Sequence, residues 1–153
     1  MNTKIVILDE NNIEQNIINE AGLVIVEGGL VAFPTETVYG LGANALDRVA
    51  VEKIFKAKGR PQDNPLIVHV ADFNIEPLVK EIPYMAKKIM NRYWPGPITL
   101  IFNKSELIPE ITSAGLETIG IRMPSGPIAR KLIEAAGRPI AAPSANISGR
   151  PSP

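Results

Sequence analysis

Short apolar runs alternate with amphipathic segments along the whole chain, and this alternation limits the folds open to it. The short runs predict strands at 4–8, 30–33, 66–71, 98–102, 118–123 and 140–142. Between them, amphipathic segments predict helices, among them 47–58, 84–94 and a helix that ends at Gly137. Strands that alternate with helices are typical of an α/β or α+β layered domain.

The segment 47–58 carries clear signals for both ends of its helix. Asp47 is a favourable N-cap and Gly59 a typical stop. Lys58 falls four residues after Ile54, so it lies on the apolar stripe that faces the core, and Arg60 follows in a polar turn. Two cations placed in this way indicate a cleft that binds anions. The alternative is that Lys58 only complements the helix dipole and Arg60 is solvated.

Weaker local signals set the ends and faces of other helices. Asn11 and Glu14 have the spacing of a capping box, and Ser125 is a candidate cap for the helix that ends at Gly137. In the helix 84–94, we expect the apolar residues Met85, Ala86, Ile89 and Tyr93 to face the core.

Four segments each present small or polar side chains on one face. Alternation along a strand places Thr118, Gly120 and Arg122 together, opposite an apolar face. The other segments contribute His69, the set Thr35, Thr37 and Tyr39 if that segment is extended, and the set Ala142, Ser144 and Asn146. Each face alone is explained by ordinary exposure to solvent, and a satisfied core histidine is the alternative for His69. Together they favour a polar cleft, because a solvated face would be richer in Lys and Glu.

Composition and charge exclude several classes of function. Sixteen basic residues balance sixteen acidic ones, which argues against charge-driven binding of nucleic acid. The chain has no cysteine and one histidine, so thiolate and histidine-rich metal sites are excluded. The first residues do not form a signal peptide, and no apolar run approaches the length that spans a membrane. We therefore expect a cytoplasmic protein without membrane contact.

The remaining charge pattern points to an oxygen-rich anion. Lys58, Arg60 and Arg122 suit phosphates and carboxylates, whereas acid pairs and Ser-His-Asp spacing are missing. Positioning and charge stabilisation, as in phosphoryl or nucleotidyl transfer, fit such groups. The stretch 40–45 matches the dinucleotide fingerprint G-x-G-x-x-A, but its glycines do not open the helix that follows.

Five motifs in fixed order, at 34–41, 58–66, 94–99, 120–124 and 143–146, resemble the YrdC-like family of threonylcarbamoyl-adenylate synthases. The resemblance runs from about the first helix to the last residue. It implies an α/β (α+β layered) fold in which helices flank a twisted mixed open sheet. It also implies one catalytic domain over 1–153. Family members continue past the equivalent of Pro153, so we expect the C-terminal elements of that domain to be missing here.

The resemblance implies a reaction in which L-threonine, bicarbonate or CO2, and ATP give threonylcarbamoyl-adenylate and pyrophosphate for the modification of tRNA. ATP is expected with Mg²⁺, without an organic cofactor or protein metal site, and tRNA or the tRNA-modifying transferase complex is the expected partner. By the same resemblance, the catalytic residues are Lys58, Arg60, Ser144 and Asn146. The ATP site comprises these four with Asn64, Thr118 and Ser152, and the threonine site comprises Thr35, Thr37, Tyr39, His69, Arg122 and Ala142.

A different class of function stays open at this point. A non-catalytic module that binds tRNA or ribosomal RNA would use a local basic face made of Lys80, Lys87, Lys88 and Arg92. Zero net charge favours a solvated helix surface instead.

Overall fold

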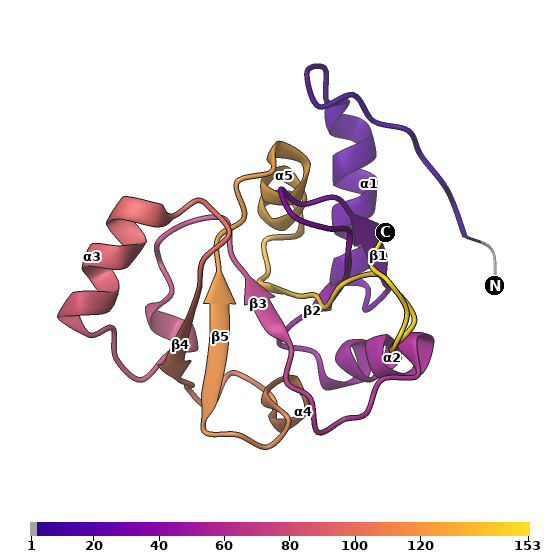
Figure 1. The fold of residues 1–153 in the computed structure, drawn as a ribbon. Helices are drawn as coiled ribbons and strands as arrows, with labels where there is room; N and C mark the ends of the chain where they lie inside the picture. Colours follow the sequence, from indigo (N-terminus) through magenta and orange to yellow (C-terminus); the bar gives the residue numbers. More distant parts are fainter. Residues whose placement is uncertain (1–2) are drawn as a thin grey trace.

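One six-stranded sheet organises the chain, and helices pack against it (Figure 1). The computed structural model describes residues 3–153. The strands are β1 (Val31–Phe33), β2 (Gly40–Asn44), β3 (Ile67–His69), β4 (Thr99–Asn103), β5 (Thr118–Arg122) and β6 (Ile140–Ala141). The helices are α1 (Gln15–Val26), α2 (Arg48–Lys58), α3 (Tyr84–Tyr93), α4 (Glu110–Ser113) and α5 (Pro127–Ala136), with a 3₁₀ turn η1 (Glu76–Leu78).

The strand order is β1-β2-β6-β3-β5-β4, and only the β3–β5 pair is parallel. The predicted mixed open sheet with flanking helices is therefore confirmed. In the register, His69 of β3 lies beside Arg122 of β5, and Thr99 of β4 lies on the other side of Arg122. The carboxyl ends of the two parallel strands thus bring a histidine and an arginine to one edge of the sheet.

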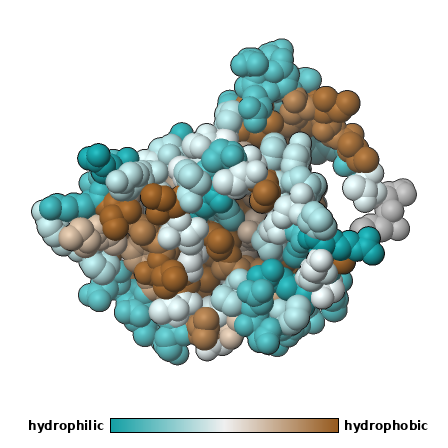
Figure 2. Space-filling view, viewed as in Figure 1, coloured by the Kyte–Doolittle hydropathy of each residue, from teal (hydrophilic) through white to brown (hydrophobic). Residues whose placement is uncertain are grey.

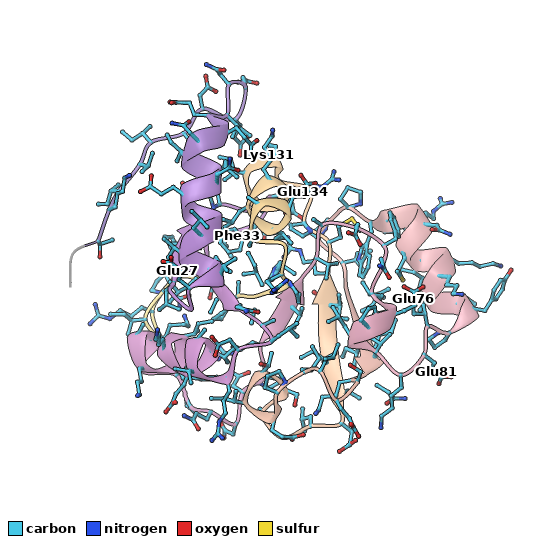
Figure 3. All side chains as sticks on the ribbon, turned by 180° about the vertical axis from the view of Figure 1, so that it is seen from behind. Glu27, Phe33, Glu76, Glu81, Lys131 and Glu134 are labelled. Atoms are coloured by element: carbon cyan, nitrogen blue, oxygen red, sulfur yellow. The ribbon has the colours of Figure 1, made fainter. Side chains whose placement is uncertain are left out.

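Two apolar clusters hold the helices on the sheet. In one, residues of α2 such as Ile54 pack with Val68 of β3 and Ile121 of β5. In the other, Phe33 packs with residues of α1 and α5, which lie side by side (Figures 1 and 3). A Cβ on Gly22 would lie 2.9 Å from the backbone of Ala135, so the absence of a side chain lets α1 and α5 approach closely.

Helix α2 has the ends that the sequence predicts. The side chain of Asp47 accepts hydrogen bonds from the backbone N–H groups of Val49 and Ala50, at 2.9 and 3.2 Å. Gly59 ends the helix in the left-handed region, with φ of 59°. These two signals fix the length of the helix and so fix Lys58 in its last turn.

Strand β2 was not predicted, and its two glycines explain why. Glycine is unfavourable in strands in general, so the stretch 40–44 has the composition of a loop. In the structure, a Cβ on Gly42 would lie 2.7 Å from side-chain atoms of both Phe33 and Ile140. The glycine is therefore required by close packing between β1 and β6. This antiparallel strand also excludes the dinucleotide-binding interpretation of 40–45.

The predicted strand at 4–8 is wrong. The segment makes no ladder with the sheet and extends away from it beside α1, where Ile5 and Ile7 are 86% and 93% exposed. Figure 2 shows this segment as a brown arm that stands off the body of the molecule. Alternating apolar residues form a strand only where a neighbouring strand edge is available, and none is at this place.

Three local helix predictions are also corrected. Helix α1 begins at Gln15 without a side-chain cap, so the Asn11–Glu14 capping box does not form. The N-cap of α5 is Gly126 rather than Ser125, because Pro127 takes the first helical position that proline favours. In α3, Met90 is buried, whereas Met85 and Tyr93 are exposed.

Among the described residues, no helix has the length and apolar character needed to cross a membrane.

Candidate functional site

A cleft of about 340 Å³ opens where β3 and β5 end. Its walls come from the segment after β1, the turn after α2, the two parallel strands and the chain after β6. The lining residues are Thr35, Thr37, Val38, Gly40, Arg60, Asn64, Pro65, Leu66, Ile67, His69, Arg122, Ala142, Pro143 and Ser144. Eight of them belong to the predicted site, so the structure brings these eight together in one cleft, while the role of each residue stays a prediction.

Arg122 forms one end of the cleft. Arg122 is the last residue of β5, and the other face of this strand carries Ile119 and Ile121, which are fully buried. The side chain of Arg122 is 11% exposed. Its Nη2 donates to Thr37 Oγ1 at 3.2 Å and forms an ion pair with Glu36 Oε1 at 2.8 Å. Its Nε is buried and has no partner within residues 3–153. The guanidinium is thus held from one side and keeps a free donor.

Glu36 was missed by the sequence analysis. If the segment were extended, the side chain of Glu36 would point to the opposite face from those of Thr35 and Thr37. No motif in the sequence indicates that Glu36 contacts Arg122. Burial alone would raise the pKa of the Glu36 carboxyl. Hydrogen bonds from Arg122 and from the backbone of Glu36 and Ser125, with the charge of Arg122, outweigh burial and lower the pKa. Glu36 is therefore a carboxylate at neutral pH.

The segment that carries these residues turns rather than extends. Thr35 Oγ1 accepts from the backbone N–H groups of Thr37 and Val38, at 3.2 and 3.3 Å, and donates to the Val38 carbonyl at 2.7 Å. The turn directs Thr37 to Arg122. The side chain of Tyr39 is half exposed and does not line the cleft, although its carbonyl accepts from the Ala145 N–H at 2.8 Å.

His69 is both buried and part of the cleft wall. His69 is 4% exposed. Its ring packs edge to face against the ring of Phe33, and the two ring centroids are 6.3 Å apart. Burial, followed by the charge of Arg122, lowers the pKa of His69 to about 4. The imidazole is neutral at pH 7, and its Nδ1 has no partner among the described residues. The ring therefore offers an unused hydrogen-bonding atom beside Arg122.

Lys58 lies behind the opposite end of the cleft. Its residue is 3% exposed, and its Nζ donates to the backbone carbonyls of Ser144 and Asn146. The Ser148 N–H donates to the Lys58 carbonyl at 3.0 Å, so the helix end and the segment after β6 are joined twice. Burial, followed by the charge of Arg60, lowers the pKa of Lys58. An ammonium has three N–H donors, and the two carbonyls take two of them.

Arg60 reaches the cleft from the same turn. Its Nε donates to the Asn64 carbonyl at 3.4 Å and its Nη2 to the Pro65 carbonyl at 3.1 Å. Partial burial lowers its pKa. The side chain is braced by its own turn and lines the cleft, and the two bonds use two of the five N–H donors of the guanidinium.

Three other predicted ATP residues gather near Lys58: Ser144, which lines the cleft, and Asn146 and Ser152, which do not. Ser144 Oγ donates to Asn146 Oδ1, and Ser152 Oγ lies 3.4 Å from the same oxygen. Asn146 Nδ2 donates to the Arg150 carbonyl at 2.7 Å, which shapes the last turn of the chain. Thr118 stands apart, at the start of β5 opposite Asn103, on the same strand face as Arg122.

The basic residues of the RNA-binding alternative lie outside the cleft lining. Lys88 sits over the ring of Tyr84 and Arg92 over the ring of Tyr93 on α3. Lys80 pairs with Glu117 at 3.7 Å. These contacts describe a solvated helix surface with local partners.

Known proteins are similar to this chain in sequence and in fold. The family model Sua5_yciO_yrdC, described as "Telomere recombination", matches residues 23–153. A threonylcarbamoyl-AMP synthase of Pyrococcus abyssi is 59% identical over 150 residues, which cover 97% of this chain and 44% of the relative. A threonylcarbamoyl-AMP synthase of Bacillus subtilis is 54% identical over 150 residues, which cover 96% and 43%.

A solved structure supports the same relationship. The crystal structure of P. abyssi Sua5 complexed with L-threonine superposes with a TM-score of 0.91 and 61% identity, covering 93% of this chain and 42% of that one. The mixed sheet with its flanking helices is thus that of a known class of α/β domain. The chain belongs to the Sua5/YciO/YrdC family. It spans less than half the length of these relatives.

Proposed function

We propose that this protein acts as a threonylcarbamoyl-AMP synthase, using L-threonine, bicarbonate or CO2, and ATP. The observation that carries the proposal is one cleft lined by both Arg122 and Arg60, with Lys58 bonded to the carbonyl of Ser144 in its wall. The names of the P. abyssi and B. subtilis relatives, and the threonine complex of P. abyssi Sua5, support it. The comparisons favour this catalytic function over the non-catalytic RNA-binding module.

The reaction divides into two bond-forming steps. The threonine amine loses a proton and bonds to the carbon of CO2, which gives a carbamate. An oxygen of the carbamate then bonds to the α-phosphorus of ATP while the bond from that phosphorus to the bridging oxygen breaks, and pyrophosphate leaves. Both steps need reactants that are held in line and charge that is stabilised, rather than a protein nucleophile.

The two ends of the cleft fit these needs. In the proposal, Arg122 binds the α-carboxylate of threonine through its free donors, with Thr37 and neutral His69 beside it. Lys58 and Arg60 stabilise the phosphate oxygens as charge moves onto pyrophosphate. Mg²⁺ arrives on the ATP phosphates, as is usual for this ion. In the proposal, the protein acts in the cytoplasm, where it would meet ATP and tRNA, and a tRNA-modifying transferase consumes the adenylate.

Detection of the product tests the proposal. The protein is incubated with MgATP, L-threonine and bicarbonate, and threonylcarbamoyl-AMP is measured by mass spectrometry. We expect the product only when all three substrates are present, and a mass increase of one when the bicarbonate carbon is ¹³C. Absence of the product, with ATP and threonine intact, contradicts the proposal. RNA binding that falls steeply with salt would then favour the RNA-binding module.

A further inference from the structure

Glu36 forms an ion pair with Arg122 at the edge of the cleft, and Glu36 itself has no part in the reaction described above. The side chains of Glu36 and Arg122 are 19% and 11% exposed, and Oε1 lies 2.8 Å from Nη2. Nη2 also donates to Thr37 Oγ1 at 3.2 Å. Because Nη2 carries two N–H groups, these two acceptors occupy both of them. The buried Nε has no partner in residues 3–153, so the guanidinium keeps donors for a ligand.

Glu36 is itself fixed from behind the cleft. Its carboxylate pairs with the guanidinium of Arg122. Gly126, the N-cap of α5, packs so closely that a Cβ there would lie 3.4 Å from the Glu36 backbone nitrogen. Glu36 does not line the cleft, whereas Thr35 and Thr37 on either side of it do. It therefore contacts the arginine without occupying the ligand space.

We propose that Glu36 is a positioning residue, which holds one corner of the Arg122 guanidinium so that its other donors face the carboxylate of an amino acid. This inference rests on the proposed function and adds a residue to its threonine site. A largely buried guanidinium without a counter-charge is costly and adopts other rotamers. Groups that hold a binding residue in place have large effects on affinity although they do not touch the ligand.

The test is a calorimetric titration of L-threonine, and separately of ATP, into the wild-type protein and Glu36→Gln. Glutamine keeps the size of the side chain and removes its charge. We expect the Kd for L-threonine to rise about tenfold, as for other supporting residues of binding sites. We expect the Kd for ATP to stay within about twofold, because Lys58 and Arg60 are untouched. Glu81→Gln, at an exposed position seen in Figure 3, serves as the matched control.

Several outcomes decide the matter. Unchanged threonine affinity, or equal losses for threonine and ATP, overturns the positioning role. Tighter threonine binding also overturns it, because Glu36 would then compete with the ligand carboxylate for Arg122. If Glu36→Gln does not fold, Glu36→Asp replaces it, because aspartate keeps the charge but has a shorter side chain. We expect Glu36→Asp to weaken the binding of threonine and to leave the binding of ATP unchanged. The wild type and Arg122→Ala separate the two proposals. If the wild type does not bind threonine, the proposed function itself fails; if the wild type binds threonine and Arg122→Ala does not, the proposed function stands and Glu36→Gln tests the positioning role alone.

Discussion

At the scale of single residues, His69 shows how burial determines the chemistry of a cleft. The folded chain lowers the pKa of His69 to about 4, first by burial and then by the positive charge of Arg122. A neutral imidazole beside a guanidinium avoids a second cation at the place where a carboxylate is proposed to bind. The side chain is thus both a core residue and a cleft residue, and the two interpretations of the sequence do not exclude each other.

The His69 pKa predicts how stability depends on pH. Between pH 6.5 and about 4 the unfolded chain binds a proton at this residue that the folded chain does not bind. The stability linked to His69 is therefore complete above pH 6.5 and is lost as the pH falls towards 4. We expect a loss of roughly 3 kcal/mol in the free energy of unfolding over this range.

Urea unfolding at a series of pH values measures this loss. His69→Gln removes the titrating group, so the variant should lose less stability than the wild type over the same range. Parallel curves for the two proteins would show that His69 does not bind a proton on unfolding.

At the scale of elements, local signals predict an element wherever a few neighbouring residues determine it. Asp47 and Gly59 define the ends of α2 through contacts within the helix itself. Alternation correctly separates the buried Ile119 and Ile121 of β5 from Arg122 on its other face. The family motifs then supply most residues of the cleft.

The remaining features depend on contacts between distant segments, which no local pattern contains. Gly42 is in a strand because Phe33 and Ile140 leave no room for a side chain. The apolar segment 4–8 has no strand edge to pair with. Glu36 meets Arg122 only after the turn at Thr35 and the end of β5 come together. Tertiary packing therefore accounts for both the missed strand and the missed site residue.

Close packing at Gly42 gives a prediction at this scale. Gly42→Ala would place a Cβ 2.7 Å from Phe33 and Ile140, whereas in Gly40→Ala the nearest atom would be 3.3 Å away. We expect Gly42→Ala to lower the free energy of unfolding by about 1–3 kcal/mol, as overpacking does. Gly40→Ala, on the same strand, should cost clearly less. Chemical denaturation compares the two, and equal costs would contradict the packing argument.

At the scale of the whole molecule, the fold brings positively charged side chains together at the ends of strands and of a helix, which the overall composition does not reveal. The net charge is zero, but Arg60 and Arg122 meet in one cleft with Lys58 behind it. Segments far apart in the sequence make this cleft: the turns after β1 and α2, the ends of β3 and β5, and the chain after β6. In the proposed function, this arrangement gives the cleft two ends with separate tasks, one for a carboxylate and one for phosphates.

The rate of pyrophosphate release tests this division most directly. It is measured with MgATP and bicarbonate while threonine and ATP are varied in turn, for the wild type, Arg122→Ala and Lys58→Ala, with the exposed Lys56→Ala as control. We predict release that requires threonine, a KM for threonine raised about tenfold or more by Arg122→Ala, and a kcat/KM for ATP lowered as much by Lys58→Ala. Release that does not need threonine, or two variants with the same effect on both substrates, would contradict a cleft with two separate ends.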